Sequence, residues 1–436
     1  MRKIKKAVSV LLVGTMIASS LVGCSNKKST SDSKDSSSKK SVEITMLNSK
    51  GEIQEGLEAI AEKYKEKTGV SIEVIACGAG ESPFQKISTM YSAGNPPTLA
   101  ILDTTDVKAI AEEKATDLSS EKWVQEMNGM TTDVNGKIYS FPLCIEGRGI
   151  IYNKTAIEKT LGKDFDPSTI NSYDSLKAIF DKLKAKGMKY PIVISKEDWS
   201  LGAHQLQYVY ETQTGDNAGA QAYIDKLKAG ESIADNKRFD EFIKTFDLLK
   251  ENNINNPDPL AATYEQDPIF LADGDAAFWF NGSWAWPNIK EAGGDKNEYG
   301  FIPYVLGNDT SDFANTKIQA SPSKQVMIDK EKATPEQVQA AKDFLNYLVY
   351  DEQGQKALVD DCSIIPVAKN NPNAPSDPLG KSIKDAMGKD GIFTASAIVP
   401  GDHWSVLGAE MQKYLAGQST KEELAKAIDS YWAAQK

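Results

Sequence analysis

Hydrophobic residues recur along the chain in two spacings, which predict strands and helices in alternation. Residues 42–47 and 70–76 are short runs rich in β-branched residues, and 99–102 follow an Asn-Pro-Pro turn, as is typical of strands. Apolar residues at i, i+3, i+4 and i+7 within 57–64 predict a helix that Gly69 ends. Strand, helix and strand in this order predict parallel pairing with right-handed crossovers, and therefore an α/β fold.

Later helices have clear boundaries in the sequence. An apolar stripe over 176–183 stops before Gly187. Residues 334–337 (Thr-Pro-Glu-Gln) form a capping box with proline in the first turn, and 420–423 repeat the box before another apolar stripe. These signals predict a helix in each of the three segments.

The amino terminus has the pattern of an export signal. Residues 2–6 are basic, and 7–22 are mostly apolar. The sequence Leu-Val-Gly-Cys at 21–24 resembles the lipobox at which bacterial lipoproteins are cut before a diacylated cysteine. We therefore predict a lipoprotein signal peptide over 1–23 and a lipid on Cys24, in preference to a plain signal peptide or an anchor helix.

The segment that follows Cys24 has no apolar residue. Residues 25–41 are Ser, Lys, Asp, Asn and Thr only, so they bury no surface that would offset the entropy of ordering. We predict that 24–41 are the lipidated cysteine and a flexible tether. The remainder would then lie at the extracytoplasmic face of the cell membrane.

Charge and composition exclude several functions. The chain of 436 residues has a net charge of −11; without the four basic residues at its start, 46 basic and 61 acidic residues leave −15. This disfavours nucleic-acid binding. With His204 and His403 as the two histidines, we predict no metal site and no cofactor. Cys77, Cys144 and Cys362 lack zinc-ligand spacing, and we favour three buried thiols over one disulfide plus one thiol.

An aromatic segment at 274–286 is the most unusual stretch of the chain. An apolar run containing Trp279 ends in a glycine turn, and Trp284 and Trp286 follow directly. A tryptophan presented from a turn offers a flat apolar wall to a sugar ring, while carboxylates and amides bind the hydroxyls. The alternative is that these tryptophans are core residues, which we expect for Trp279.

The aromatic segment resembles a signature of bacterial extracellular solute-binding proteins of the carbohydrate-binding type, the maltose-binding-protein-like family. Other stretches resemble the family in the same order. These stretches are 139–142, 149–154, 172–183, 191–193, Trp199, 341–348, 351–355, 365–367, 400–404 and the final helices to Trp432. The resemblance spans 42–436.

The resemblance implies an α/β, two-lobed fold of the periplasmic-binding-protein-like type II, with a ligand cleft between lobes joined by hinge strands. Lobe 1 would be 42–146 plus 302–349, and lobe 2 would be 147–301 plus 350–436. A sugar or oligosaccharide would bind in the cleft, and closure would let the protein dock on the transmembrane permease of an ABC importer. The protein would be monomeric and not an enzyme.

The resemblance also implies ligand-binding residues in two regions. Trp284 matches the stacking tryptophan, and Trp404 matches a second aromatic residue near the carboxy-terminal helices. Asp402 and His403, just before it, are candidate partners for hydroxyls; a core histidine is the alternative for His403.

The first strands supply further candidates. Ser49 and Lys50 lie on the loop after the first strand, where relatives contact sugar. The alternative for Lys50 is an ordinary surface lysine. Asp103 ends the third strand, where relatives place a polar contact; its alternative is a helix N-cap.

Four further residues are considered for their position in the chain. Glu146 and Arg148 lie in the hinge passage and would either pair with each other or let one face the ligand. Trp199 would line the cleft or close lobe 2. Glu81 is a further candidate ligand contact.

Two other classes of protein remain open from the sequence. A secreted glycan-active enzyme would need two carboxylates at a defined separation, which the sequence does not locate. A glycan sensor or adhesion lipoprotein without transport would have the same fold and cleft.

Overall fold

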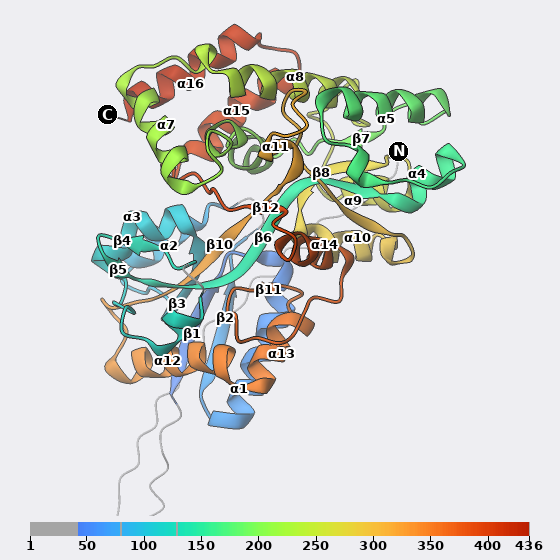
Figure 1. Ribbon diagram of the computed structural model, residues 1–436. Helices are drawn as coiled ribbons and strands as arrows, with labels where there is room; N and C mark the ends of the chain where they lie inside the picture. The colour runs from blue at the N-terminus through green and yellow to red at the C-terminus, as the bar shows by residue number, and fades with distance from the viewer. Residues whose placement is uncertain (1–41, 79–80, 128–129, 436) are drawn as a thin grey trace, which may run out of the picture. The chain divides into compact units, whose positions relative to one another are not determined.

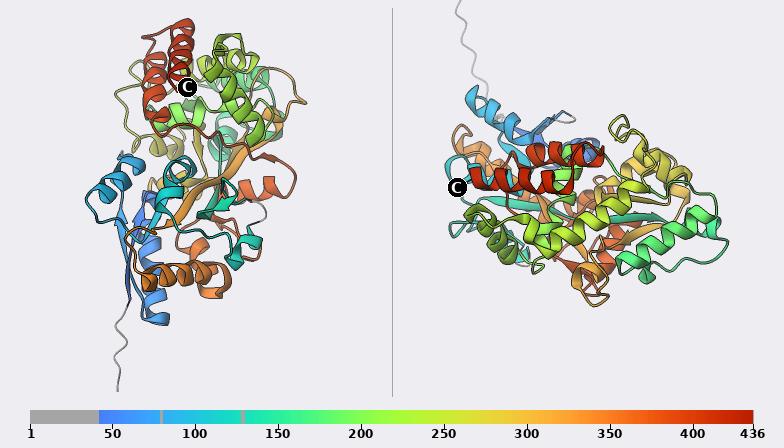
Figure 2. Two further views of the ribbon diagram at one scale, coloured as in Figure 1. Left: turned by 90° about the vertical axis from the view of Figure 1, so that its left-hand side faces the viewer. Right: turned by 90° about the horizontal axis from the view of Figure 1, so that it is seen from above.

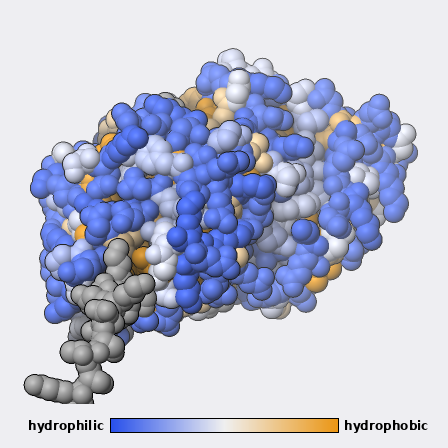
Figure 3. Space-filling view, turned by 90° about the horizontal axis from the view of Figure 1, so that it is seen from below, coloured by the Kyte–Doolittle hydropathy of each residue, from blue (hydrophilic) through white to orange (hydrophobic). Residues whose placement is uncertain are grey.

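The computed structural model describes residues 42–78, 81–127 and 130–435. The predicted signal peptide, Cys24 and the tether lie outside these residues. Within the described part, no helix has both the length and the apolar character that a membrane span requires. The face drawn in Figure 3 is mainly hydrophilic, with apolar residues scattered singly.

The first three predicted strands and the first helix are confirmed. The strands are β1 (Glu43–Asn48), β2 (Ser71–Ala76) and β3 (Leu99–Asp103), and both β2 and β3 pair with β1 in parallel. Helix α1 (Gln54–Thr68) ends at Gly69, whose φ of 79° is left-handed, a conformation that glycine adopts without cost.

One mixed sheet of ten strands organises the described chain, in the order β2-β1-β3-β10-β6-β8-β7. Its longest strands, β6 (Ser140–Asn153) and β10 (Ile318–Ile328), pair antiparallel and run through the middle of Figure 1. The remaining strands of this sheet are β7 (Ile192–Val193), β8 (Phe278–Gly282), β9 (Tyr299–Ile302), β11 (Ile365–Pro366) and β12 (Ile392–Phe393). A separate hairpin joins β4 (Asp133–Val134) and β5 (Lys137–Ile138).

Helices cover the sheet, and the predicted helix starts are confirmed. Helix α5 (Tyr173–Ala185) contains the predicted stripe. Helices α12 (Pro335–Tyr350) and α16 (Lys421–Ala434) each begin with the complete capping box. The other α-helices are α2 (Pro83–Ser92), α3 (Thr104–Lys114), α4 (Lys154–Leu161), α6 (Tyr208–Glu211), α7 (Asn217–Ala229), α8 (Lys237–Glu251), α9 (Asp267–Asp273), α10 (Trp286–Glu291), α11 (Phe313–Thr316), α13 (Glu352–Asp360), α14 (Pro378–Met387) and α15 (His403–Leu415).

The apolar interior divides into separate packed clusters. One cluster joins α5, α7, α8, α15 and α16, and Figure 2 shows α15 and α16 lying side by side. A second joins β1, α1, α12 and α13, and it also contains Trp279, which is fully buried as predicted. A third, smaller cluster joins β3 with α3. Strand β6 supplies residues to the first two clusters, so it links them.

Gly149 should be intolerant of any side chain, because β6 is packed closely against β9. A Cβ atom at Gly149 would lie 2.7 Å from the backbone oxygen of Ile302, which cannot move aside. We expect Gly149→Ala to lower the free energy of unfolding by about 1–3 kcal/mol in urea denaturation. At Gly51 a Cβ meets nothing within 4 Å, so Gly51→Ala should change stability by less than about 0.5 kcal/mol. Equal stability of the two variants would contradict this packing.

Candidate functional site

The antiparallel pairing of β6 and β10 brings polar side chains of the two strands together. Glu146 of β6 faces Ser321 of β10, and Arg148 faces Gln319. Because side chains alternate along a strand, Glu146 and Arg148 lie on the same face. Lys50, another candidate residue, contacts Glu146 on this face.

An ion-pair group around the buried Lys50, which we call the charged cluster, lies on this face. It comprises Lys50, Glu52, Glu146 and Ser323. Lys50 Nζ contacts the carboxylates of both Glu52, at 2.5 Å, and Glu146, and the Ser323 hydroxyl also donates to Glu146. Lys50 is only 3% exposed, so its charge depends on these partners rather than on water.

Lys50 and Glu146 each favour the ionised state of the other. Burial alone would lower the pKa of Lys50, but Glu146 and Glu52 raise it well above its usual value. Burial would likewise raise the pKa of Glu146, and Lys50 and Lys324 hold it below its usual value. Lys50 therefore pairs internally, and the alternative of a surface lysine is wrong.

The local sequence explains why Lys50 turns inward. Asn48 ends β1 fully buried, and its side chain accepts a hydrogen bond from the Lys50 N–H at 2.8 Å and donates to the Lys50 carbonyl at 3.0 Å. This turn fixes the backbone of the loop directly after the strand.

A second ion pair joins the end of β3 to the interior of β10. Lys324 Nζ lies 2.7 Å from Asp103, its cross-strand partner, and 3.5 Å from the Ser49 hydroxyl. The Asp103 side chain is 43% exposed, so it retains capacity for a ligand. Asp103 occupies the N-cap position of α3, but its side chain makes no capping bond.

Four rings form what we call the aromatic cluster: Trp199, His204, Tyr264 and Trp284. The Trp199 ring lies edge-on to Tyr264 and to His204, with centroids 5.3 Å apart in both pairs. His204 lies 4.7 Å from Trp284. These separations are those of favourable aromatic pairs.

A rare π-helix, η4 (Trp199–Gln205), creates this arrangement. A π-helix bonds residue i to i+5, so it brings Trp199 and His204 to the same side. Backbone contact with α15 fixes η4: a Cβ at Gly202 would lie 2.5 Å from the Trp404 oxygen, and one at Gly408 would lie 2.5 Å from the Asp198 oxygen. The two glycines thus hold η4 against the start of α15, where Trp404 is half-buried.

The charged and aromatic clusters are neighbours. The Gly147 N–H, beside Glu146, donates to the Ser283 hydroxyl, beside Trp284, at 3.2 Å. Burial lowers the pKa of His204 well below its usual value, and the positive charges of Arg148 and Lys324 add to this shift. Burial likewise raises the pKa of Tyr264, with a contribution from Glu52. The Gly147–Ser283 hydrogen bond therefore places the aromatic rings beside the ionised groups.

Two expectations require correction. His403 is fully buried among Tyr210, Tyr431 and Trp432, and burial lowers its pKa to about 3, so it is a core residue and not a ligand contact. Glu146 and Arg148 do not pair with each other, because Arg148 binds the carboxylate of Glu211 in α6 instead.

Of the other predicted residues, Glu81 and Asp402 lie outside the two clusters, whereas Trp199 and Trp284 belong to the aromatic cluster. Glu81 is exposed and accepts hydrogen bonds from Gly78 N–H and Lys86, which shape its own loop. Asp402 is exposed, and its carboxylate accepts from the Tyr431 hydroxyl at 2.8 Å. Trp199 and Trp284 are partly exposed within the aromatic cluster.

The three thiols carry no disulfide. Cys144 and Cys362 are buried, as predicted, whereas Cys77 is only half-buried. In the described ranges, no group of three or more His, Cys, Asp or Glu residues is arranged to hold a metal ion.

Several residues of this locus were missed from the sequence. Glu52, His204, Tyr264, Ser323 and Lys324 belong to the clusters or contact them. Lys324 and Ser323 reach the site through the register of β10, which spacing along the chain does not reveal. The one local signal was the spacing of Glu146 and Arg148, two charged residues that lie two positions apart in an otherwise mainly apolar strand.

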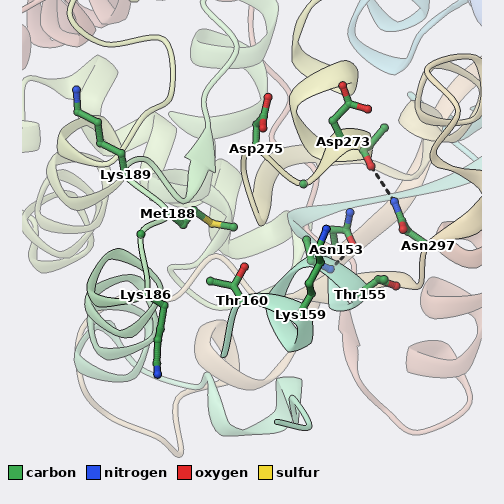
Figure 4. Close-up of a pocket in the computed structure, with 14 residues that line it drawn as sticks. Asn153, Thr155, Lys159, Thr160, Lys186, Met188, Lys189, Asp273, Asp275 and Asn297 are labelled. Carbon is green, nitrogen blue, oxygen red and sulfur yellow. Dashed lines mark hydrogen bonds between the residues drawn. The ribbon is translucent and has the colours of Figure 1, made fainter. Parts of the chain in front are cut away.

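Two surface pockets lie elsewhere and do not contain the aromatic cluster. One, of about 530 Å³, is lined by Lys159, Lys186 and Lys189 together with Asp273 and Asp275 (Figure 4). The other, of about 470 Å³, includes Trp286 and Lys290. The first lacks an aromatic wall, so it does not match the chemistry expected of a sugar site.

The fold matches solved sugar-binding proteins over almost the whole chain. A structure of the solute-binding protein RafE in complex with raffinose superposes with a TM-score of 0.73 at 21% identity, covering 91% of this chain and all of the other. The maltose-bound MalE3 of T. maritima gives a TM-score of 0.65 at 18% identity, with 91% and 100% covered. The mixed α/β fold is therefore that of the periplasmic sugar-binding proteins.

Sequence comparison gives the family. The profile of the bacterial extracellular solute-binding proteins matches residues 59–388, so the chain belongs to this family of non-catalytic binding proteins of ABC transporters. An ABC transporter extracellular-binding protein of Pyrococcus horikoshii is 25% identical over 398 residues, 87% of this chain and 84% of that protein. A maltooligosaccharide ABC transporter solute-binding lipoprotein of Streptococcus pneumoniae serotype 4 is 24% identical over 388 residues, with 84% and 81% covered.

Lys50 should be essential to the stability of the charged cluster. Lys50→Met leaves Glu146 buried without its cationic partner, and we expect a loss of about 3–5 kcal/mol in the free energy of unfolding. Replacing both partners by apolar residues, in the double variant Lys50→Met plus Glu146→Leu, should recover part of this loss. Urea denaturation measures both effects.

The matched control is Lys65→Met. Lys65 is half-exposed and lies 3.9 Å from Glu62, so its loss should cost less than about 1 kcal/mol. If Lys50→Met were as mild as this control, the buried ion pair would not contribute as described.

Proposed function

We propose that the protein binds a sugar or oligosaccharide between the aromatic and charged clusters and delivers it to the permease of an ABC importer. The observation that carries this proposal is the proximity of Trp199 and Trp284 to ionised, hydrogen-bonding groups. Apolar C–H faces of a sugar ring pack on indole, while carboxylates and lysines bind hydroxyls. Trp404, Asp103 and Ser49 are further proposed contacts. Lys50 and Glu146 would form the polar floor of the site.

The relatives support a carbohydrate as the ligand. Solved structures with this fold contain raffinose, stachyose and maltose. A multiple sugar-binding protein of Streptococcus mutans is 28% identical over 159 residues, 36% of this chain and of that protein. The exact sugar is set by the polar contacts around the aromatic cluster.

We further propose that the body consists of two lobes that close on the ligand. Residues 42–146 and 302–349 would form lobe 1, and 147–301 with the carboxy-terminal helices would form lobe 2. The packing of α13 on α1 and α12 favours assigning 350–368 to lobe 1 as well. Strands β6 and β10 would be the hinge strands, because β6 contributes to both large apolar clusters.

Trp284→Ala should weaken sugar binding strongly if the indole stacks on the ligand. We expect a loss of about 2–3 kcal/mol, or about 30- to 140-fold in Kd, by calorimetric titration with the tightest binder among raffinose, stachyose and maltotriose. Trp286→Ala is the control: this half-buried indole lies in the 470 Å³ pocket beside Tyr299 and should leave Kd unchanged. Equal affinities for both variants would remove Trp284 from the site.

We propose that Cys24 carries the lipid that anchors the protein to the extracytoplasmic face of the membrane. In a bacterial host, labelled palmitate should enter the wild-type protein and the Cys77→Ala control, but not Cys24→Ala. Globomycin, which blocks the lipoprotein signal peptidase, should make the precursor accumulate. Labelling of Cys24→Ala, or no labelling of the wild type, would contradict the anchor.

A further inference from the structure

Buried polar atoms without hydrogen-bond partners are concentrated beside the aromatic cluster. Among the described residues there are twelve such side-chain atoms, and four of them lie between Glu197 and Gln205. They are Glu197 Oε2, His204 Nδ1 and both amide atoms of Gln205; a fifth is Arg148 Nε. An unpaired buried polar atom costs free energy, so such a concentration marks a place where a ligand would supply the missing partners.

His204 is the member of this group that lies within the aromatic cluster. Its ring is 4.7 Å from Trp284 and 5.3 Å from Trp199, the two tryptophans proposed to stack on sugar. The π-helical turn and the Gly202–α15 contact fix its backbone. A ligand held against either indole would therefore lie beside this ring.

The charges nearby are already paired, which restricts the ligand. Lys50 binds Glu52 and Glu146, Lys324 binds Asp103, and Arg148 binds Glu211. Each of these three cations already has a carboxylate partner, so none is free to bind the carboxylate of an acidic sugar. Burial and the neighbouring positive charges keep His204 uncharged, so it offers one donor and one acceptor rather than a charge.

We propose that His204 is the specificity-determining residue of this site, and that its Nδ1 atom forms the hydrogen bond that selects a hydroxyl group of a neutral oligosaccharide over a carboxylate. A hydroxyl group both donates and accepts, so it matches either tautomer of the ring, whereas a carboxylate only accepts and matches only the tautomer with its proton on Nδ1. The buried site must also desolvate the charge of a carboxylate, which disfavours it further. Gln205, the next residue along η4, has an amide donor and acceptor that also lack partners. This inference rests on the proposed sugar-binding function.

A matched pair of variants tests the hydrogen bond separately from packing. Asn and Leu have nearly the same shape, but only Asn places a polar group close to the position of Nδ1. Kd is measured by calorimetry on the purified full-length protein with the tightest binder among raffinose, stachyose and maltotriose. His204→Leu should weaken binding about tenfold or more, and His204→Asn should stay within about threefold of the wild type. Urea denaturation establishes that both variants are folded.

The outcomes separate this inference from the function beneath it. Equal loss in the Asn and Leu variants, or no loss in His204→Leu, would show that His204 only packs and would overturn the inference while leaving sugar binding intact. Tighter binding of trigalacturonic acid than of any neutral trisaccharide by the wild type would also overturn it, with no variant needed. If the wild type bound no sugar at all, the proposed function itself would fail.

Discussion

The antiparallel pairing of β6 with β10 is the constraint on which the rest of the structure depends. Both strands are largely buried, so every backbone N–H and C=O must find a partner in the sheet. Strand β6 bonds to β10 on one side and to β8 and β9 at its far end, and β11 pairs near its middle. The large apolar clusters are therefore joined through these strands, although the β6–β10 register shifts on both sides of Lys324.

This register also assembles the site. It places Glu146 opposite Ser321 and brings Ser323 within hydrogen-bonding reach of Glu146, while the β3–β10 pairing sets Lys324 against Asp103. The charged cluster then holds the loop after β1 through Lys50. A buried ion pair costs desolvation energy, so the intact pair adds little net stability, although losing one partner leaves a costly buried charge. The pair therefore orients hydrogen-bonding groups beside the tryptophans.

Much of the fold could be predicted from the sequence because its signals are local. The strands at 42–47 and 99–102, the helix ended by Gly69 and the capping boxes at 334–337 and 420–423 each depend on residues only a few positions apart. The core position of Trp279 followed from its place inside an apolar run.

The site was less predictable because distant segments build it. His403 follows Asp402 in a promising motif, yet the first turn of α15 directs it into the core with Trp432. His204 gave no local signal, because a π-helix is not encoded by any simple spacing and the ring acquires its role only through Trp284. The role of each histidine therefore depends on its neighbours in the folded structure and not on a local sequence motif.

The most direct test of the account is a calorimetric titration of the purified wild-type protein with neutral oligosaccharides, followed in parallel by tryptophan fluorescence. The account predicts saturable binding of at least one sugar, with a change in tryptophan emission as the ring covers Trp199 and Trp284. Saturable sugar binding without any change in tryptophan emission, or no binding across a broad panel of neutral oligosaccharides, would contradict the aromatic cluster as the ligand site.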